Sequence, residues 1–132
     1  PAIFSVHSFT HAWKGVARPW HVAMLADVDT GFHSHMLSGL RDLPDIVVGD
    51  NEPYDGALKG DCMHTHGIRR GLQHALVVLR LDLIGDEAGQ ARWAKLLAPI
   101  LKNFADDPAN RERRYFSSRT GSYIKDDGKT QN

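Results

Sequence analysis

Four short segments rich in consecutive apolar residues restrict the fold of this sequence more than any other feature. They are residues 2–10 (AIFSVHSFT), 20–27 (WHVAMLAD), 45–50 (DIVVGD) and 74–84 (HALVVLRLDLI). Each is bounded by charged or turn-forming residues, which suits the length of a strand. Strands that are apolar on both sides are typical of sheets with both faces covered. The segments therefore predict a sheet buried between other layers.

Two further segments have helical periodicity. Residues 31–43 place Phe32, Met36, Leu37 and Leu40 on one side, and Pro44 follows. In residues 86–104 an apolar stripe at i, i+3, i+4 and i+7 predicts a longer helix, which Pro99 should kink. Strands that alternate with helices predict an α/β fold, with a mostly parallel or mixed sheet flanked by helices.

The 132 residues suit a single domain, with residues 1–105 as its α/β part and residues 106–132 as a polar C-terminal tail that is frayed from 126 onward. Sixteen basic and sixteen acidic residues balance, so we expect neither nucleic acid nor an anionic membrane as a partner. No apolar run could span a bilayer, there is no basic leader, and Cys62 is the single cysteine. These features predict a cytoplasmic protein.

Polar side chains gather at three of the predicted strand ends. They are His7–Ser8, Asp50–Asn51–Glu52 and Arg80–Asp82. Because sites in α/β sheets form beyond the carboxyl ends of strands, we expect these clusters to meet. The stretch VVGDNEPYDG, residues 47–56, is either an acidic surface turn or the rim of such a site.

Histidines and a cysteine offer two possible metal sites. His7, at the end of a predicted strand, is a candidate ligand or base, although a packed, hydrogen-bonded histidine is the commoner outcome. Cys62, His64 and His66 would share one face if their segment were extended. A polar loop is the alternative for that segment, since no fourth ligand stands nearby.

Three arginines are candidates for binding carboxylates. Arg70 lies between glycines in GIRRG, and Arg18 is followed directly by a proline and a tryptophan. Arg80 lies among leucines and needs a partner if it is buried, for which Asp50 and Asp82 are available. The sequence contains no glycine-rich phosphate loop, nucleophile elbow, HExxH motif or kinase signature.

Four motifs together resemble the C-terminal half of the N-formylglutamate amidohydrolase family, over residues 3–104. They are VHSFT, ARPWHVAML, VGDNEPYDG and HGIRRGLQHALVVLRLDLI. The resemblance implies a zinc-carboxypeptidase-like, three-layer α/β fold. It also implies zinc-dependent hydrolysis of the amide of an N-acyl amino acid, a step of amino-acid (histidine) catabolism.

The resemblance also assigns roles to residues of this chain. It implies that His7 is a zinc ligand and that Arg18 and Arg80 are catalytic, because they would steady the oxyanion and the substrate carboxylates. The substrate-binding residues that it implies are Arg70, Asn51, Glu52, Tyr54 and His66.

The sequence departs from the family pattern in two ways. The N-terminal half, which carries the first metal ligands of the family, is absent, and Val78 stands where the family has a glutamate. Loss of a general base typically slows a reaction about 10²–10⁴-fold. A non-catalytic binding or assembly module is therefore the alternative function. We also expect a homo-oligomer or a partner that supplies the missing half, because an open sheet edge favours association.

Overall fold

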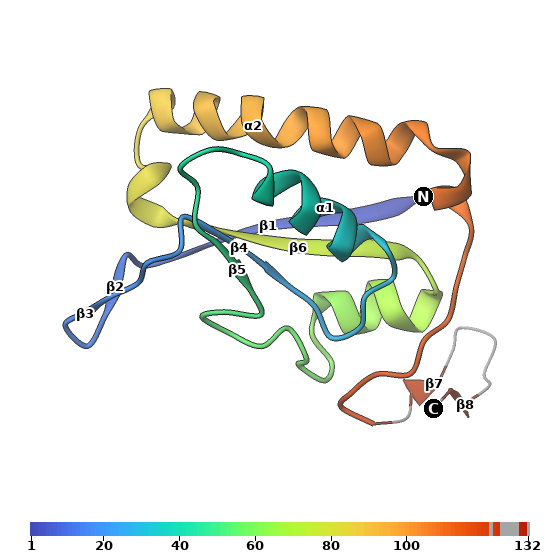
Figure 1. The fold of residues 1–132 in the computed structure, drawn as a ribbon. Helices are drawn as coiled ribbons and strands as arrows, with labels where there is room; N and C mark the ends of the chain where they lie inside the picture. The colour runs from blue at the N-terminus through green and yellow to red at the C-terminus, as the bar shows by residue number, and fades with distance from the viewer. Residues whose placement is uncertain (122, 125–129, 132) are drawn as a thin grey trace.

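A four-stranded mixed sheet forms the centre of the protein (Figure 1). The computed structural model describes residues 1–121, 123–124 and 130–131. The sheet has the order β1-β6-β4-β5, with β1 at Ala2–Phe9, β6 at Gln73–Arg80, β4 at Val22–Leu25 and β5 at Val48–Asp50. β1 and β6 run parallel, and so do β4 and β5, whereas β4 and β6 are antiparallel.

Two helices cover one face of the sheet, α1 (Phe32–Arg41) and α2 (Glu87–Asp106) (Figure 1). The main core lies between these helices and the strands, where the rings of Phe32 and Phe104 stack with their centroids 3.9 Å apart. Asp86 caps α2, since its side chain accepts a hydrogen bond from the backbone N–H of Gly89 at 2.7 Å. The predicted apolar stripe is the buried side of α2, and the helix continues through Pro99.

Short helical turns cover part of the other face. They are η1 (Met63–Gly67), a π-helical turn that lies against β6, and η2 (Ile68–Arg70), a 3₁₀ turn. Phe9, Ala23, Leu25 and Val78 form a second, smaller core on this face. Because both faces are covered, β4 and the centre of β6 are apolar throughout. The predicted α/β class with a mixed sheet flanked by helices is confirmed.

Several small elements complete the fold. β2 (Ala12–Trp13) and β3 (Val16–Ala17) form a hairpin, which the sequence did not predict. η3 (Leu81–Leu83) follows β6, and η4 (Pro108–Arg111) follows α2. β7 (Tyr123–Ile124) pairs with β8 (Thr130–Gln131). Of the stretch 126–132 that was expected to be frayed, residues 126–129 and 132 lie outside the described residues.

The predicted elements exist, but most of their bounds differ. The strand expected over 45–50 begins only at Val48, since Asp45 has a positive φ of 60° that breaks the extended backbone. The strand expected over 74–84 ends at Arg80, because the next three residues turn as η3. The helix expected over 31–43 spans Phe32–Arg41, and the strand expected over 20–27 spans Val22–Leu25.

The three polar strand ends do not all meet, so that prediction was wrong in part. Phe9 pairs with Arg80, which places the ends of β1 and β6 at the same edge of the sheet. β5 runs in the opposite direction, and Asp50 turns toward α1, where its carboxylate contacts Nε2 of His33 at 2.9 Å. The sequence could not show this, because strand direction depends on pairing between distant segments.

The described residues include no helix that combines the length and the apolar character needed to cross a membrane.

Candidate functional site

A pocket of about 300 Å³ lies on the face of the sheet opposite α1 and α2. Its floor consists of side chains from three strands, namely Ser5, His7, Leu25 and Leu76. Its wall is formed by Met63 of η1 and by residues of the segment that joins β5 to η1, namely Tyr54, Asp55, Gly56, Leu58, Asp61 and Cys62. The pocket therefore brings together two predicted site residues, His7 and Tyr54.

His7 is exposed on β1, where it lies directly beside Val78 of β6 in the parallel ladder. Residues paired in this way point to the same face of a sheet. Val78 is 4% exposed and packs into the second core. The resemblance implies a general base at position 78. This position is the immediate neighbour of His7, but the side chain of Val78 cannot accept a proton.

Asn51 shapes the 51–56 loop, which follows β5 and carries Tyr54. Its backbone is left-handed, with φ at 52°, and its side-chain oxygen accepts hydrogen bonds from the N–H groups of Ala26 at 2.8 Å and Gly56 at 3.2 Å. A Cβ on Gly56 would lie 2.4 Å from the nitrogen of Ala26, so only glycine permits this approach. The amide of Asn51 therefore folds the loop back over the sheet.

Replacement of Asn51 by alanine should lower the free energy of unfolding by about 1–3 kcal/mol, since two backbone N–H groups would lose their acceptor. Denaturant titration measures this difference. Asn51→Asp is the matched control, because aspartate keeps an acceptor oxygen and tolerates a positive φ. Equal losses in both variants would contradict the role of the side-chain oxygen.

Arg18 lies beside Tyr54, which lines the pocket, and its guanidinium is surrounded by aromatic rings. Its guanidinium carbon lies 5.2 Å from the ring centroid of Tyr54, 5.7 Å from that of Trp13 and 5.8 Å from that of Phe9. Its Nη1 donates to the hydroxyl of Tyr54 at 3.1 Å and to both oxygens of Thr10 at 3.3 Å. These contacts hold the half-buried guanidinium of Arg18 beside Tyr54, which lines the pocket.

Arg80 contacts the backbone of the segment that carries Arg18. Its Nε and Nη2 donate to the carboxylate of Asp82, and its Nη1 donates to the backbone oxygens of Arg18 and Trp20, both at 3.4 Å. Of the two acids that the sequence offered as partners, Asp82 is the one that pairs with Arg80. Arg80 is thus placed to hold the segment that carries Arg18.

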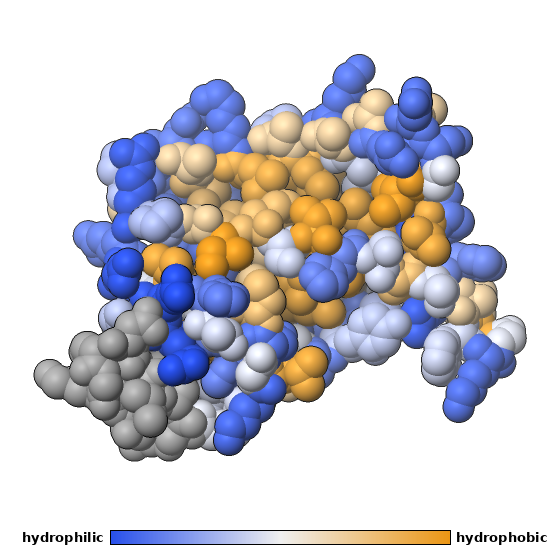
Figure 2. Space-filling view, turned by 180° about the vertical axis from the view of Figure 1, so that it is seen from behind, coloured by the Kyte–Doolittle hydropathy of each residue, from blue (hydrophilic) through white to orange (hydrophobic). Residues whose placement is uncertain are grey.

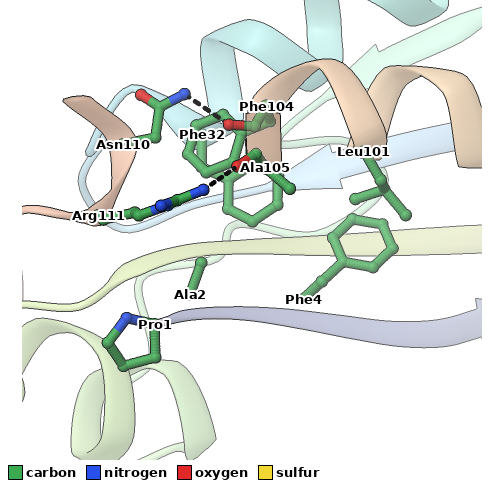
Figure 3. A pocket seen from close by; sticks show the side chains of 9 residues that line it. All are labelled: Pro1, Ala2, Phe4, Phe32, Leu101, Phe104, Ala105, Asn110 and Arg111. Carbon is green, nitrogen blue, oxygen red and sulfur yellow. Dashed lines mark hydrogen bonds between the residues drawn. The ribbon is translucent and has the colours of Figure 1, made fainter. Parts of the chain in front are cut away.

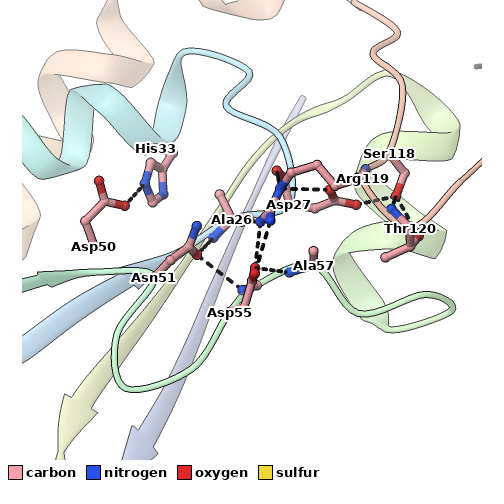
Figure 4. A network of polar contacts seen from close by, with 11 residues as sticks. Ala26, Asp27, His33, Asp50, Asn51, Asp55, Ala57, Ser118, Arg119 and Thr120 are labelled. Atoms are coloured by element: carbon pink, nitrogen blue, oxygen red, sulfur yellow. Dashed lines mark hydrogen bonds and ion pairs between the residues drawn. The ribbon is translucent and has the colours of Figure 1, made fainter.

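Two carboxylates line the pocket, and both are engaged. Arg119 donates to both oxygens of Asp55, at 2.6 and 3.0 Å, and holds the pKa of that carboxyl at about 2 (Figure 4). Asp61 accepts the backbone N–H of His64 at 2.7 Å. A carboxylate with a pKa of about 2 is a weak base near neutral pH, so Asp55 is poorly suited to act as a general base.

The C-terminal segment contributes to this wall in a way that the sequence did not indicate. Ser118 and Arg119 both bind Asp27, which is nearly buried at the end of β4 (Figure 4). Arg119 then reaches Asp55 of the pocket wall. The predicted polar tail is therefore partly packed, since Ser118 is buried. No local pattern could reveal contacts between residues about ninety positions apart.

The contribution of the Asp55–Arg119 pair to stability should depend on pH. Because the pKa of Asp55 is lowered from 3.8 to about 2, mainly by the hydrogen bond from Arg119, the contribution is present above pH 3.8 and lost as the pH falls through about 2. We expect Asp55→Asn to unfold more easily at pH 7, by less than about 1 kcal/mol since the pair is exposed. The difference from the wild type should vanish near pH 2 in thermal unfolding. A pH-independent difference would contradict this.

The other predicted catalytic and substrate-binding residues lie outside the pocket lining. Glu52, His66 and Arg70 are exposed, and Asn51 acts on the backbone as described above. The segment of Cys62, His64 and His66 forms the π-helical turn η1 rather than an extended chain, so the premise for a shared face was wrong. His64 is buried there, whereas Cys62 and His66 are exposed.

The donor set does not fit a complete zinc site. Among the described residues, no three histidine, cysteine or acidic side chains are grouped so that they could hold a metal ion. His7 faces a pocket whose acids are already bound by Arg119 and by the backbone of His64. A zinc ion at His7 would require ligands from beyond the described part of this chain.

Comparison with known proteins gave neither a matching family model nor a matching curated protein. Among solved structures, the chain is similar to the crystal structure of gene product Atu2144 from Agrobacterium tumefaciens, with 28% sequence identity and a TM-score of 0.62. The match covers 80% of this chain and 44% of that chain, so the present chain spans less than half the length of that protein. The match supports the α/β fold and names no activity.

Proposed function

We propose that the pocket belongs to an N-formylglutamate amidohydrolase-like site and binds the carboxylate end of an N-acyl amino acid. The observation that carries this proposal is the fixed guanidinium of Arg18 beside Tyr54, a residue that lines the pocket together with His7. With Nη1 engaged, the remaining N–H groups of Arg18 can donate to a carboxylate in a forked arrangement. Arg80 serves as the support that keeps Arg18 in place.

The family reaction is hydrolysis of the substrate amide, for which zinc would polarise the acyl carbonyl. In this proposal His7 supplies one ligand, and the other ligands and the base come from elsewhere in a complete site. The described residues of this chain do not provide them. The proposed setting is cytoplasmic amino-acid (histidine) catabolism, with a homo-oligomer or a second polypeptide completing the sheet.

A non-catalytic binding or assembly module is the second candidate. It is favoured by Val78, which occupies the place beside His7 where a hydrolase of this kind needs a carboxylate. Such a module would keep the carboxylate-binding arginine and lose turnover. The two candidates therefore differ in chemistry but share the ligand.

Formate release from N-formylglutamate, with and without added zinc, separates the two candidates. Zinc-dependent release by this chain alone would support the hydrolase and defeat the binding module. Saturable binding of N-formylglutamate without formate release, measured by calorimetry, would support the module. Absence of both binding and turnover would contradict both candidates.

A further inference from the structure

Arg119 connects the pocket wall to the end of β4 through one guanidinium group (Figure 4). Its Nη1 and Nη2 donate to the two carboxylate oxygens of Asp55, at 3.0 and 2.6 Å. Nη2 also donates to the backbone oxygen of Ala26 at 2.8 Å, and Nε donates to that of Asp27 at 2.6 Å. Four of the five N–H groups of the guanidinium are thus used. The cation is therefore held in place directly against Asp55.

The backbone around Arg119 is anchored independently of the guanidinium. The N–H of Arg119 donates to the carboxylate of Asp27 at 2.7 Å, and the hydroxyl of Ser118 donates to the same carboxylate. The N–H of Arg114 donates to the backbone oxygen of Gly71 at 2.8 Å. Because these contacts do not use the side chain of residue 119, a shorter or uncharged side chain there should leave the C-terminal segment in position.

The pocket is acidic apart from this pairing. Asp55 and Asp61 both line it, and the pKa of Asp55 lies at about 2, so Asp55 is charged at neutral pH. Asp61 accepts the backbone N–H of His64, which carries no net charge. A carboxylate without a cation repels an anion that enters the same cavity. The cation on Asp55 therefore bears directly on which ligands the pocket accepts.

Two cavities lined by β1 and α2 have no such acid. Figure 2 shows an apolar band across this side of the molecule. Among the described residues, no aspartate or glutamate lines either cavity. In one of them the polar side chains of Asn110 and Arg111 donate to the backbone oxygens of Phe104 and Ala105 (Figure 3). A lining acid that is paired with an arginine thus distinguishes the pocket of Asp55 from these two.

We propose that Arg119 determines the charge selectivity of this pocket, because its pairing with Asp55 allows an anionic ligand to enter. Arg119 acts through Asp55 and does not need to touch the ligand. The shape of the loop has another support, since Asn51 already binds the N–H groups of Ala26 and Gly56. The inference rests on the proposed function for the identity of the anion, N-formylglutamate, whereas the charge effect does not depend on that ligand.

The size of the effect follows from the size of the pocket. A cavity of about 300 Å³ is roughly 8 Å across, and over that distance one unit charge changes the affinity for an anion about twofold in bulk water and about 30-fold at a dielectric constant of about 20. Asp55 and Arg119 are exposed, so we expect the lower part of this range.

The first test uses Cys62, the single cysteine of the sequence, which is exposed and lines the pocket. Iodoacetate is an anion and iodoacetamide is neutral, and both alkylate the thiolate. The ratio of their rates therefore cancels the thiolate fraction and reports the local charge. Arg119→Met should lower the ratio of the iodoacetate rate to the iodoacetamide rate by at least about twofold, as measured by mass spectrometry.

Further variants separate charge from loop shape. Asp55→Asn should raise the ratio, because Arg119 then lacks its counter-charge, and Asp55→Asn combined with Arg119→Met should return it close to the wild-type value. Loss of loop shape would not give opposite signs, since both single variants weaken the same contact. Arg119→Lys keeps the charge and should stay near the wild type. Arg92→Met removes one positive charge from the exposed side of α2 and is the matched control.

The second test measures the ligand. In calorimetry with N-formylglutamate, Arg119→Met should weaken binding at least about twofold, and the double variant with Asp55→Asn should restore it. Circular dichroism and thermal unfolding check that each variant is folded. If Arg119→Met does not fold, Asp55→Asn alone decides, since a raised alkylation ratio supports the proposal and an equal or lower ratio contradicts it.

Two outcomes would overturn the proposal. They are an alkylation ratio that Arg119→Met leaves unchanged, and a double variant whose ratio is as low as that of Arg119→Met. A wild type that does not bind N-formylglutamate but shows the expected alkylation pattern would instead remove the proposed ligand and support the charge selectivity. Binding of N-formylglutamate with equal ratios in all variants would retain the ligand and remove the role of Arg119.

Discussion

Val78→Glu should lower the free energy of unfolding at pH 7 by about 3–5 kcal/mol, because it places a carboxylate in a buried apolar position without a partner. Val78 is 4% exposed and packs with Phe9, Ala23 and Leu25. The substitution also restores the carboxylate that the resemblance implies beside His7. The apolar surroundings of position 78 therefore suit a valine and not a carboxylate. Denaturant titration measures the loss.

The loss of unfolding free energy in Val78→Glu should depend on pH, and the burial of the side chain determines the direction of this dependence. Burial raises the pKa of a carboxyl group, so the folded variant holds its proton to a higher pH than the unfolded chain. The destabilisation is therefore small below about pH 4.3, the ordinary pKa of glutamate, and grows as the pH rises. Val78→Gln, which has no charge to lose, should show a loss that does not change with pH. An equal pH-independent loss in both variants would show that Glu at this position reaches solvent.

Arg18→Met should weaken binding of N-formylglutamate about 10–100-fold, the effect of removing a charge-assisted hydrogen bond of about 1.5–3 kcal/mol. Methionine keeps much of the apolar stem between the rings of Trp13 and Tyr54 but offers no donor. Calorimetry measures the affinity, and thermal unfolding checks that the hairpin is intact. Arg92→Met, on the solvent side of α2, is the matched control and should bind as the wild type does.

Tyr54→Phe separates the roles of the ring and the hydroxyl at this site. It removes the hydrogen bond to Arg18 and keeps the aromatic face, so binding should fall far less than in Arg18→Met. If Arg18→Met and Arg92→Met bind N-formylglutamate equally well, the carboxylate does not lie at Arg18. The pocket would then need another cation, or another ligand.

The fold could be read from the sequence to the extent that it depends on local patterns. Apolar runs predicted β1, β4, β5 and β6, and the stripe from Trp93 to Phe104 predicted α2. The hairpin of β2 and β3 was missed, because each strand is only two residues long and carries no periodicity. The bounds of β5 were set by the backbone at Asp45, which apolar patterns do not encode.

The candidate site was only partly predictable. His7 and Tyr54 line one pocket, and Arg18 contacts Tyr54. The side-chain oxygen of Asn51, which was expected to bind substrate, accepts backbone N–H groups of Ala26 and Gly56. Arg119 was not predicted, since its partners Asp27 and Asp55 lie far away in the sequence.

The sequence by itself determined the main elements and the apolar character of the central strands, because these are properties of residue type and short-range spacing. The tertiary structure alone decided the direction of β5, the pairing of His7 with Val78 and the placement of Arg18 among three rings. It also placed β1 at the end of the strand order in the described sheet. The physical reason is that strand pairing and side-chain contact join residues far apart in the chain, and their geometry is fixed only when the whole sheet forms.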